Sequence, residues 1–372
     1  MHPEQIIKHP EKFIKQLIQP LFNTGRTRQI FNVNPTLPNT RKEVEEIKIS
    51  IFSYYGDELV EEQCNHVKDI QMHYNQNGVS WINVDGIKKE EIEAICQQFK
   101  VHPLIVEDIL SFGQRPKMDE IDNVLFGLLN MLYFNEKHAS VEVEQISIVL
   151  GKHFVITFQE DPDRDVFNML REKLKIKSSK LRLRGADYLC YSLLDMIVDH
   201  YFVVMEKLVD RIEAIEEEII RQANVRSLAR INNFRKELIV LRRNVVPVRD
   251  LINGFRNTES DLIDGAVEKY FKDIYDHILQ ANDFVDNYRD MLNNLQELYI
   301  SKVNLKMNEV MKVIAVVTCI LAPATVIGGI FGMNFDVIPF QHSYWAFYST
   351  VVFMLIVVPV FMIWIFKRRG WF

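Results

Sequence analysis

Cysteine is scarce in this 372-residue chain, and no two of its four cysteines lie close together in the sequence. They form no CxxC pair and no Cys/His group at the spacing of metal ligands, which argues against a zinc ribbon or a redox pair. Their scatter is typical of reduced thiols that pack as small apolar side chains. The four are Cys64, Cys96, Cys190 and Cys319.

Sequence motifs for nucleotide binding and for hydrolysis are also absent. The sequence has no GxxxxGK(S/T), no HExxH, no GxSxG, and no GxGxxG after an expected strand. Its ten histidines are spread thinly, and we expect them to be structural. From these absences we expect that the protein is not an enzyme and that it binds no organic cofactor. A transporter with this sequence would be driven by the gradient of its own substrate.

Basic residues are in the minority, with 44 Lys and Arg against 50 Asp and Glu. Residues 313–372 hold a single acid and three basic residues, so the acidic surplus resides in the part before them. Nucleic-acid binding needs a basic stripe that neutralises phosphates, and its absence argues against a nucleic-acid partner. The N-terminus, MHPEQIIKHPEKF, has no apolar core of a signal peptide, so we expect it to stay in the cytoplasm.

Two stretches lack charge entirely, residues 313–331 and residues 345–366. Each is long enough to cross about 30 Å of hydrocarbon as a helix. The loop 332–344 between them has no Lys or Arg, whereas three lysines at 302–312 precede the first stretch and residues 367–369 after the second are all basic. By the positive-inside rule, both termini are cytoplasmic and the loop is external. We expect a cytoplasmic body anchored by two helices in the plasma (inner) membrane.

The first of these stretches also carries a stripe of small or weakly polar residues at alternating steps of four and three, which places them on one helix face. Small residues in such a stripe are common where membrane helices pack closely. The hydroxyls of Thr318 and Thr325 would equally suit a water-filled pore wall, and the pattern alone leaves both interpretations open. Two helices cannot enclose a pore, so pore lining would require a homo-oligomer. The stripe comprises Met311, Ala315, Thr318, Ala322, Thr325, Gly329 and Gly332.

Upstream, residues 44–162 predict a cytoplasmic α/β domain, preceded by an N-terminal helix and connector at residues 1–43. Runs rich in Val, Ile and Phe predict strands at 44–54, 79–84, 122–134 and 144–158. Helical spacing of apolar residues predicts helices at 88–99 and 103–112.

After this domain the sequence becomes helical. Residues 163–260 predict long cytoplasmic helices, with no break between 186 and 252 stronger than Pro247. Residues 261–312 predict a stalk helix that continues into the first membrane stretch. A helix from about 262 to 331 would be near 100 Å long.

The segment Phe331-Gly332-Met333-Asn334-Phe335, followed by a short loop, one more apolar stretch and the ending KRRGWF at 367–372, resembles the CorA family of magnesium transporters. The resemblance continues upstream through HPLIVEDIL, YSLLDMIVDH, YFKDIYDH and NEVMKV, and it covers nearly the whole chain. It implies a funnel-shaped homopentamer with a cytoplasmic α/β domain, long stalk helices and a two-helix membrane segment.

The resemblance also implies the path of the ion. Gly332, Met333 and Asn334 would form the pore entrance, where Asn334 presents a ring of neutral carboxamides to the hydrated ion. Amide oxygens can contact the water shell of Mg²⁺, which this ion gives up reluctantly, and a carboxylate ring would hold it too tightly. The pore below would be lined by Asn308, Met311, Ile314, Thr318, Ala322, Thr325 and Gly329.

A regulatory metal site follows from the same resemblance, at Glu107, Asp108, Asp195 and Asp273. These acids would face one another across subunit boundaries, where bound Mg²⁺ relieves their repulsion and favours a closed ring. Intracellular Mg²⁺ would then inhibit its own entry. The resemblance therefore implies Mg²⁺ as both cargo and regulator, with Co²⁺ and Ni²⁺ as further cargo. The expected partners are other copies of the chain and the lipid membrane, without a nucleotide.

The sequence departs from the family pattern at two places. Ala322 stands where many relatives carry methionine, which predicts a wider pore there. The external loop reads FDVIPFQ and lacks the Pro-Glu step of magnesium-transporting members, which leaves Asp336 as its only acid. A Zn²⁺ transporter of the same fold, with proton coupling left open, is therefore an alternative. A membrane-anchored structural or sensor protein is another, but an anchor has no need of Thr318, Thr325 and Asn334 on one helix register.

Overall fold

The chain divides by its internal contacts into two compact units. The larger one ends at Gln296, and the smaller one holds Glu297–Phe372 with the short segment Ile219–Ala223. The expected N-terminal helix and connector, together with Asn334 and Asp336, lie outside the described residues. The part of the chain that the computed structural model describes comprises residues 47–64, 66–162, 164, 166–333 and 343–370.

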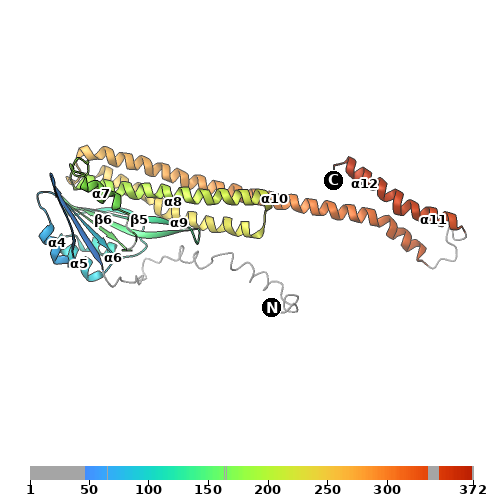
Figure 1. Cartoon of the computed structure of the whole chain (residues 1–372), viewed down its shortest axis with the longest axis horizontal. Helices are drawn as coiled ribbons and strands as arrows, with labels where there is room; N and C mark the ends of the chain where they lie inside the picture. The colour runs from blue at the N-terminus through green and yellow to red at the C-terminus, as the bar shows by residue number, and fades with distance from the viewer. Residues whose placement is uncertain (1–46, 65, 163, 165, 334–342, 371–372) are drawn as a thin grey trace. The chain divides into compact units, whose positions relative to one another are not determined.

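The larger unit is built on one seven-stranded sheet, in the order β2-β1-β3-β7-β6-β5-β4 (Figure 1). The pair β3–β7 is parallel, and every other neighbouring pair is antiparallel. The strands are β1 (Lys48–Tyr55), β2 (Glu58–Cys64), β3 (Val79–Asp85), β4 (Lys117–Ile121), β5 (Val124–Asn135), β6 (Ser140–Leu150) and β7 (Phe154–Gln159).

The sequence predicted the central strands but missed both edges of the sheet. β2 and β4 are short and mostly polar, as edge strands often are, so they lack the apolar alternation that marks a strand; β2 is largely exposed and β4 is half-buried. The single run predicted over 144–158 was wrong, because it holds two strands. They are joined by a tight turn in which the Gly151 N–H donates to the Phe154 carbonyl at 2.9 Å.

One face of the sheet is covered by three short helices, α4 (Val67–His73), α5 (Lys89–Gln98) and α6 (Pro103–Leu110) (Figure 1). Their isoleucines pack on the inward-facing strand residues and form an apolar core, to which each buried side chain contributes about 1.5–3 kcal/mol. Isoleucines that the helices bring to it are Ile70, Ile92, Ile95, Ile105 and Ile109, and the strands supply Ile49, Ile51, Ile82, Val84, Phe126, Leu128, Val149, Ile156 and Phe158.

The other face is covered by α7 (Asn168–Lys175) and by two long helices, α8 (Ala186–Gln222) and α9 (Val225–Asn257). Buried hydrogen bonds fix both long helices to the sheet. The Tyr201 hydroxyl of α8 donates to the Asn130 carbonyl at 2.7 Å, and the Asn130 side chain donates to Asn244 Oδ1 of α9 at 2.8 Å. These two hydrogen bonds fix where α8 and α9 lie along the strands of the sheet.

The expectation of an unbroken helical stretch from 186 to 252 was wrong at one point. α8 ends at Gln222, and the side chain of Asn224 caps the next helix by accepting from the Ser227 N–H at 3.0 Å. An asparagine at this position favours the start of a new helix, because its side chain satisfies a backbone N–H that has no partner within the helix. Pro247 lies inside α9 without interrupting it.

The prediction of one continuous helix near the C-terminus is confirmed, since α10 runs from Gly265 to Phe331 over 67 residues. Within the larger unit its buried positions follow the heptad steps of a helix seam. The ring of Phe271 stacks on Phe255 of α9 at 5.7 Å, and the ring of Phe284 meets Phe202 of α8 at 6.0 Å. The buried positions are Val267, Phe271, Ile274, Ile278, Ala281, Val285, Leu292 and Leu295.

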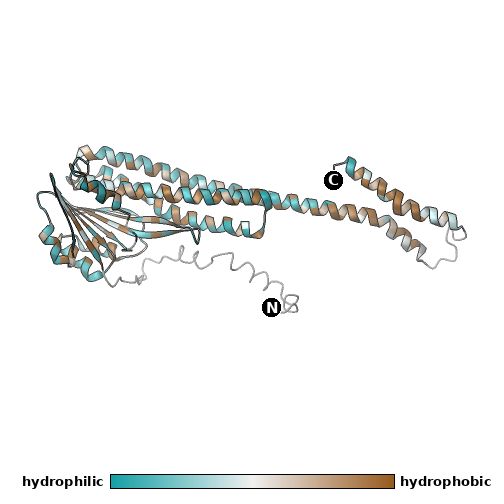
Figure 2. Cartoon of the chain, viewed as in Figure 1, coloured by the Kyte–Doolittle hydropathy of each residue, from teal (hydrophilic) through white to brown (hydrophobic). Residues whose placement is uncertain are grey.

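The smaller unit contains the apolar end of α10 and a second apolar helix. This helix begins as α11 (Tyr344–Val352), passes through a π-helical turn η2 (Phe353–Val357) and ends as α12 (Val358–Arg368). The π turn ends two residues before Pro359, whose missing N–H removes a regular hydrogen bond to the preceding turn. Figure 2 shows the apolar character of the C-terminal part of α10 and of most of the second helix.

Three of the described helices are long and apolar enough to cross a membrane: α8, α10 and the helix Tyr344–Arg368. Half of the apolar window of α8 is buried inside the larger unit, whereas only 6% of the window is buried in each of the other two. Burial therefore identifies α8 as a core helix of the larger unit. The two exposed helices contain the two stretches predicted to span the membrane.

A buried acid on the sheet makes the stability of the larger unit depend on pH. Glu144 on β6 is 3% exposed, and its Oε1 accepts from the backbone N–H groups of Glu160 at 3.1 Å and Asp161 at 2.9 Å. Burial raises the pKa of Glu144 to about 7, although the Asp161 N–H acts in the opposite direction. The folded state thus retains a proton that the unfolded state releases from about pH 4.5 upward.

We expect Glu144→Gln to stabilise the protein above pH 7 and to leave its stability nearly unchanged at pH 4.5 or below. In the wild type, stability falls as pH rises from about 4.5 to about 7, because ionising Glu144 costs up to roughly 3 kcal/mol in the folded state. Glutamine keeps the acceptor and carries no charge. Thermal unfolding of the purified chain from pH 4.5 to 8 measures the difference. Exposed Glu90→Gln is the control, and parallel pH profiles for wild type and Glu144→Gln would contradict the prediction.

Candidate functional site

The four acids predicted as a regulatory site come from three helices, and within one chain they do not form one cluster. Glu107 and Asp108 lie on α6, which begins with Pro103 and is capped where His102 Nδ1 accepts from the Leu104 N–H at 3.2 Å. Glu107 is exposed. Asp108 already has partners in its own chain.

The partners of Asp108 are a lysine and a glutamine. Lys117 Nζ lies 2.6 Å from Asp108 Oδ2, and the side chain of Gln114 donates to Asp108 Oδ1 at 2.8 Å. A metal ion that used this carboxylate would have to compete with Lys117. The exposed acid Glu107 has no such competitor among the described residues, so it is the more available ligand on α6.

The structure instead brings Asp195 together with two residues that the sequence analysis missed. Asp195, Asp199 and His277 each offer one ligand atom, and these three atoms lie within 4.8 Å of one another. Asp195 and Asp199 are four residues apart on α8 and so share a face of that helix. His277 faces them from α10. We call these three residues the α8–α10 cluster.

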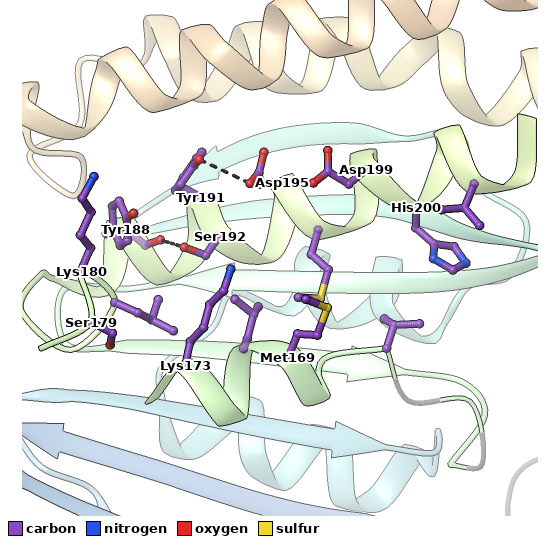
Figure 3. A pocket seen from close by; sticks show the side chains of 15 residues that line it. Met169, Lys173, Ser179, Lys180, Tyr188, Tyr191, Ser192, Asp195, Asp199 and His200 are labelled. Carbon is purple, nitrogen blue, oxygen red and sulfur yellow. Dashed lines mark hydrogen bonds between the residues drawn. The ribbon is translucent and has the colours of Figure 1, made fainter. Parts of the chain in front are cut away.

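Aromatic contacts hold α10 against α8 next to this cluster. The ring of Tyr191 on α8 lies 5.1 Å from that of Tyr270 and 6.1 Å from that of Phe271, both on α10. The hydroxyl of Tyr191 also donates to Asp195 Oδ2 at 3.4 Å. The position of the Asp195 carboxylate is therefore set by a neighbour that is itself packed between the two helices (Figure 3).

The electrostatics of the cluster favour a bound cation. Burial and, after it, the nearby charge of Asp199 raise the pKa of Asp195 to about 6, while His277 and the Tyr191 hydroxyl oppose the shift. Asp273, one turn before His277 on α10, also raises it. Three acids thus approach one another with little positive charge between them, and a divalent cation would relieve their repulsion.

A cavity of about 500 Å³ opens beside the cluster between α7 and α8. Asp195, Asp199 and His200 line it from α8, and Lys173 lines it from α7, pointing toward α8 (Figure 3). Tyr191 contributes to the same wall. The cavity gives solvent ions access to the two carboxylates of the cluster.

In the smaller unit, the residues predicted to line the pore are exposed along α10. The hydroxyl of Thr318 donates to the Ile314 carbonyl at 2.8 Å, and that of Thr325 donates to the Leu321 carbonyl at 3.0 Å. Each hydroxyl has therefore given its only proton to its own helix and presents its oxygen as an acceptor. The exposed positions are Asn308, Met311, Ile314, Thr318, Ala322, Thr325 and Gly329.

This face continues toward the N-terminus of α10 beyond the predicted pore residues. Glu297, Ser301 and Asn304 extend the same steps of four and three, and all three are exposed. They line a shallow hollow of about 340 Å³ together with Asn308. Their spacing is readable in the sequence, but they precede the uncharged stretch whose small residues mark the stripe.

The predicted pore entrance follows directly on the end of α10. The Gly332 N–H donates to the Gly328 carbonyl at 3.0 Å, and the Met333 N–H donates to the Ile330 carbonyl at 3.2 Å. A Cβ on Gly332 would lie 3.1 Å from the Gly328 oxygen, so a side chain here would crowd the closing turn of the helix. Asn334 and Asp336 belong to the part of the chain that is not described.

Comparison with known proteins gives consistent matches over most of the chain. A family model described as "CorA-like Mg2+ transporter protein" matches residues 76–368. The chain is 35% identical to the cobalt/magnesium transport protein CorA of Thermotoga maritima, over 90% of this chain and 95% of that protein. It is 30% identical to the putative metal ion transporter YfjQ of Bacillus subtilis, over 78% of this chain and 89% of that protein.

A solved structure shares the fold. The complete structure of the CorA magnesium transporter from Methanocaldococcus jannaschii matches with a TM-score of 0.70 at 22% identity, over 88% of this chain and 99% of the other. At this identity the match establishes the fold, which combines an α/β domain with a long helix and an apolar C-terminal helix.

Proposed function

The chain belongs to the CorA family of Mg²⁺ transporters, and we propose that it conducts Mg²⁺ across a membrane as a homopentamer. As a member of a transporter family it is a transport protein and not an enzyme. In our proposal the ion moves down its own electrochemical gradient through a pore formed by α10 of five chains. Co²⁺ and Ni²⁺ are further cargo, and no nucleotide or organic cofactor takes part.

The observation that carries this proposal is the oxygen-bearing face of α10. Asn308, Thr318 and Thr325 are exposed on one side of a helix that is otherwise apolar at its C-terminal end. Polar side chains that face lipid are costly, so such a face belongs against water or against other copies of the chain. A ring of copies of the chain provides both environments, because neighbouring copies pack against the helix and the ring encloses water along this face.

Conduction follows from the chemistry of this face. Mg²⁺ sheds water slowly, so a fast path must pass it with its water shell largely in place. Hydroxyl oxygens that only accept, as at Thr318 and Thr325, can receive hydrogen bonds from the water around the ion. Asn334 would do the same at the entrance, next to Gly332 and Met333. Met311 and Ile314, nearer the cytoplasm, would form an apolar constriction that closes by dewetting.

Gating in this proposal depends on acids that meet between subunits. Glu107 and Asp273 are exposed in the single chain and so are available to another copy. Intracellular Mg²⁺ bound among Glu107, Asp108, Asp195 and Asp273 would join neighbouring chains and hold the ring closed. Loss of Mg²⁺ would restore the repulsion and open the pore.

In the proposed orientation the protein spans the inner membrane of the cell. Its larger unit and both termini lie in the cytoplasm. Lys367 and Arg368 at the end of α12, like Lys306 and Lys312 before the first apolar stretch, are exposed and suit the anionic cytoplasmic surface. Loop 332–344 would then be external, where Asp336 attracts cations toward the entrance.

The direct test is flux in liposomes that contain the purified chain. We expect Mg²⁺ uptake that follows the membrane potential, is inhibited by Co²⁺ and Ni²⁺ as competitors, and does not change when a pH gradient is imposed. Mg²⁺-sensitive dye inside the vesicles measures the rate, and protein-free vesicles give the background. Zn²⁺ uptake that requires a proton gradient, with no Mg²⁺ uptake, would replace this proposal by the Zn²⁺ alternative.

A further inference from the structure

We propose that Asp195, Asp199 and His277 bind one late first-row transition-metal ion per chain, such as Co²⁺, Ni²⁺ or Zn²⁺, in preference to Mg²⁺. The site lies within one chain, between α8 and α10. It shares Asp195 with the acids of the proposed gating, but it requires neither a second copy of the chain nor ion flux.

The geometry of the α8–α10 cluster suits a metal ion. Its three ligand atoms lie within 4.8 Å of one another, a separation that one ion of typical 2.0–2.2 Å bond lengths can bridge after small side-chain movements. The two carboxylates come from adjacent turns of α8, and the imidazole comes from α10. Because the ligands come from two helices of the larger unit, the packing of α10 on α8 fixes how far apart they lie.

The nitrogen donor decides the class of ion. Mg²⁺ prefers an octahedral shell of oxygen atoms and rarely takes imidazole. Imidazole suits Co²⁺, Ni²⁺ and Zn²⁺, and the affinity of a mixed nitrogen and oxygen site rises along the first transition row. A site of two carboxylates and one histidine therefore discriminates against Mg²⁺, although Mg²⁺ is the more abundant ion in cells.

An independent observation points to a missing ligand at the histidine. The Nδ1 atom of His277 is shielded from solvent within a side chain that is 41% exposed, and it has no hydrogen-bond partner among the described residues. Its separation from Asp199 Oδ1 is 3.8 Å, which is too long for a hydrogen bond. A buried polar atom without a partner is destabilising, and a metal ion between His277 and Asp199 would satisfy it.

The surroundings complete the site. The 500 Å³ cavity that Asp195 and Asp199 line provides an entry path and room for water ligands in the remaining coordination positions. The Tyr191 hydroxyl donates to Asp195 Oδ2 and would orient that carboxylate toward the ion. Three protein ligands with open positions allow the ion to exchange, as a sensor requires.

Co²⁺ binding to the full-length chain in detergent tests this proposal. We expect Co²⁺ absorption bands at one ion per chain that persist in excess Mg²⁺ and disappear when Zn²⁺ is added. His277→Gln and Asp199→Asn should each weaken this Co²⁺ binding on the order of 10- to 100-fold. His200→Gln is the matched control, since His200 lines the same cavity but lies outside the cluster, and it should bind Co²⁺ like the wild type.

X-ray absorption of the Co²⁺-loaded wild type provides a second measurement that needs no variant, and it should show an imidazole nitrogen bound to Co²⁺. An all-oxygen shell, displacement of Co²⁺ by equimolar Mg²⁺, or unchanged binding in His277→Gln would each overturn the proposal. Because binding is measured at equilibrium without a membrane gradient, failure here leaves the transport proposal standing, and failure of Mg²⁺ flux leaves this site standing.

Discussion

Replacing Asn334 with alanine is expected to abolish Mg²⁺ uptake while leaving the oligomer intact. In the proposed pore, this change removes five carboxamides at once from the entrance. A hydrogen bond contributes about 0.5–1.5 kcal/mol, so losing five contacts to the hydrated ion lowers the flux by roughly a hundredfold or more. Mg²⁺ uptake into liposomes measures the effect, and size-exclusion chromatography with light scattering measures the assembly.

The matched control is Gln341→Ala, which removes another carboxamide from the same loop outside the Gly-Met-Asn segment. It should retain uptake. Normal Mg²⁺ flux through an intact Asn334→Ala oligomer would remove Asn334 from the pore entrance. Loss of the oligomer itself would mean that Asn334 acts in assembly instead.

Asp273→Lys is expected to keep the channel open at internal Mg²⁺ concentrations that close the wild type. Asp273 is exposed on α10 and lies near enough to Asp195 to raise its pKa. A lysine ammonium at this position would repel a divalent cation and remove one of its ligands, so the closed ring would lose the ion that holds it together. Flux in proteoliposomes loaded with increasing Mg²⁺ measures the inhibition directly.

Asp283→Lys makes the same change of charge at another exposed acid on α10, outside the predicted regulatory set, and should leave inhibition as in the wild type. Unchanged inhibition in Asp273→Lys would exclude Asp273 from the sensor. Equal loss of inhibition in both variants would show that the net charge of α10 matters and not one site.

The features that sequence alone predicted well are those that depend only on local composition. Two uncharged stretches mark the apolar helices, because length and hydropathy suffice to recognise them. The long helix α10 was also predictable, since no Gly or Pro follows Gly265 before the first apolar stretch, and Pro323 within that stretch does not interrupt the helix. The edge strands β2 and β4 were not, because their pairing depends on a neighbour and not on their own pattern.

The α8–α10 cluster shows which part of a functional site could not be predicted from the sequence. Asp199 lies one helical turn from the predicted Asp195, and its spacing was visible in the segment DMIVD. His277 is 78 positions further along the chain, and only the packing of α10 on α8 brings it to the two acids. Family resemblance supplied Asp195 and Asp273, but neither resemblance nor spacing pointed to a histidine ligand.

The threonines of α10 have a consequence for the sign of the charge that can pass. Thr318 and Thr325 donate their protons to Ile314 and Leu321, so their side chains cannot donate to anything in the lumen. An anion such as chloride needs donors to replace its lost hydration, and it would meet only oxygen lone pairs at these two levels. The proposed pore would thus reject anions even when fully open, without a charged residue in the apolar part of its wall.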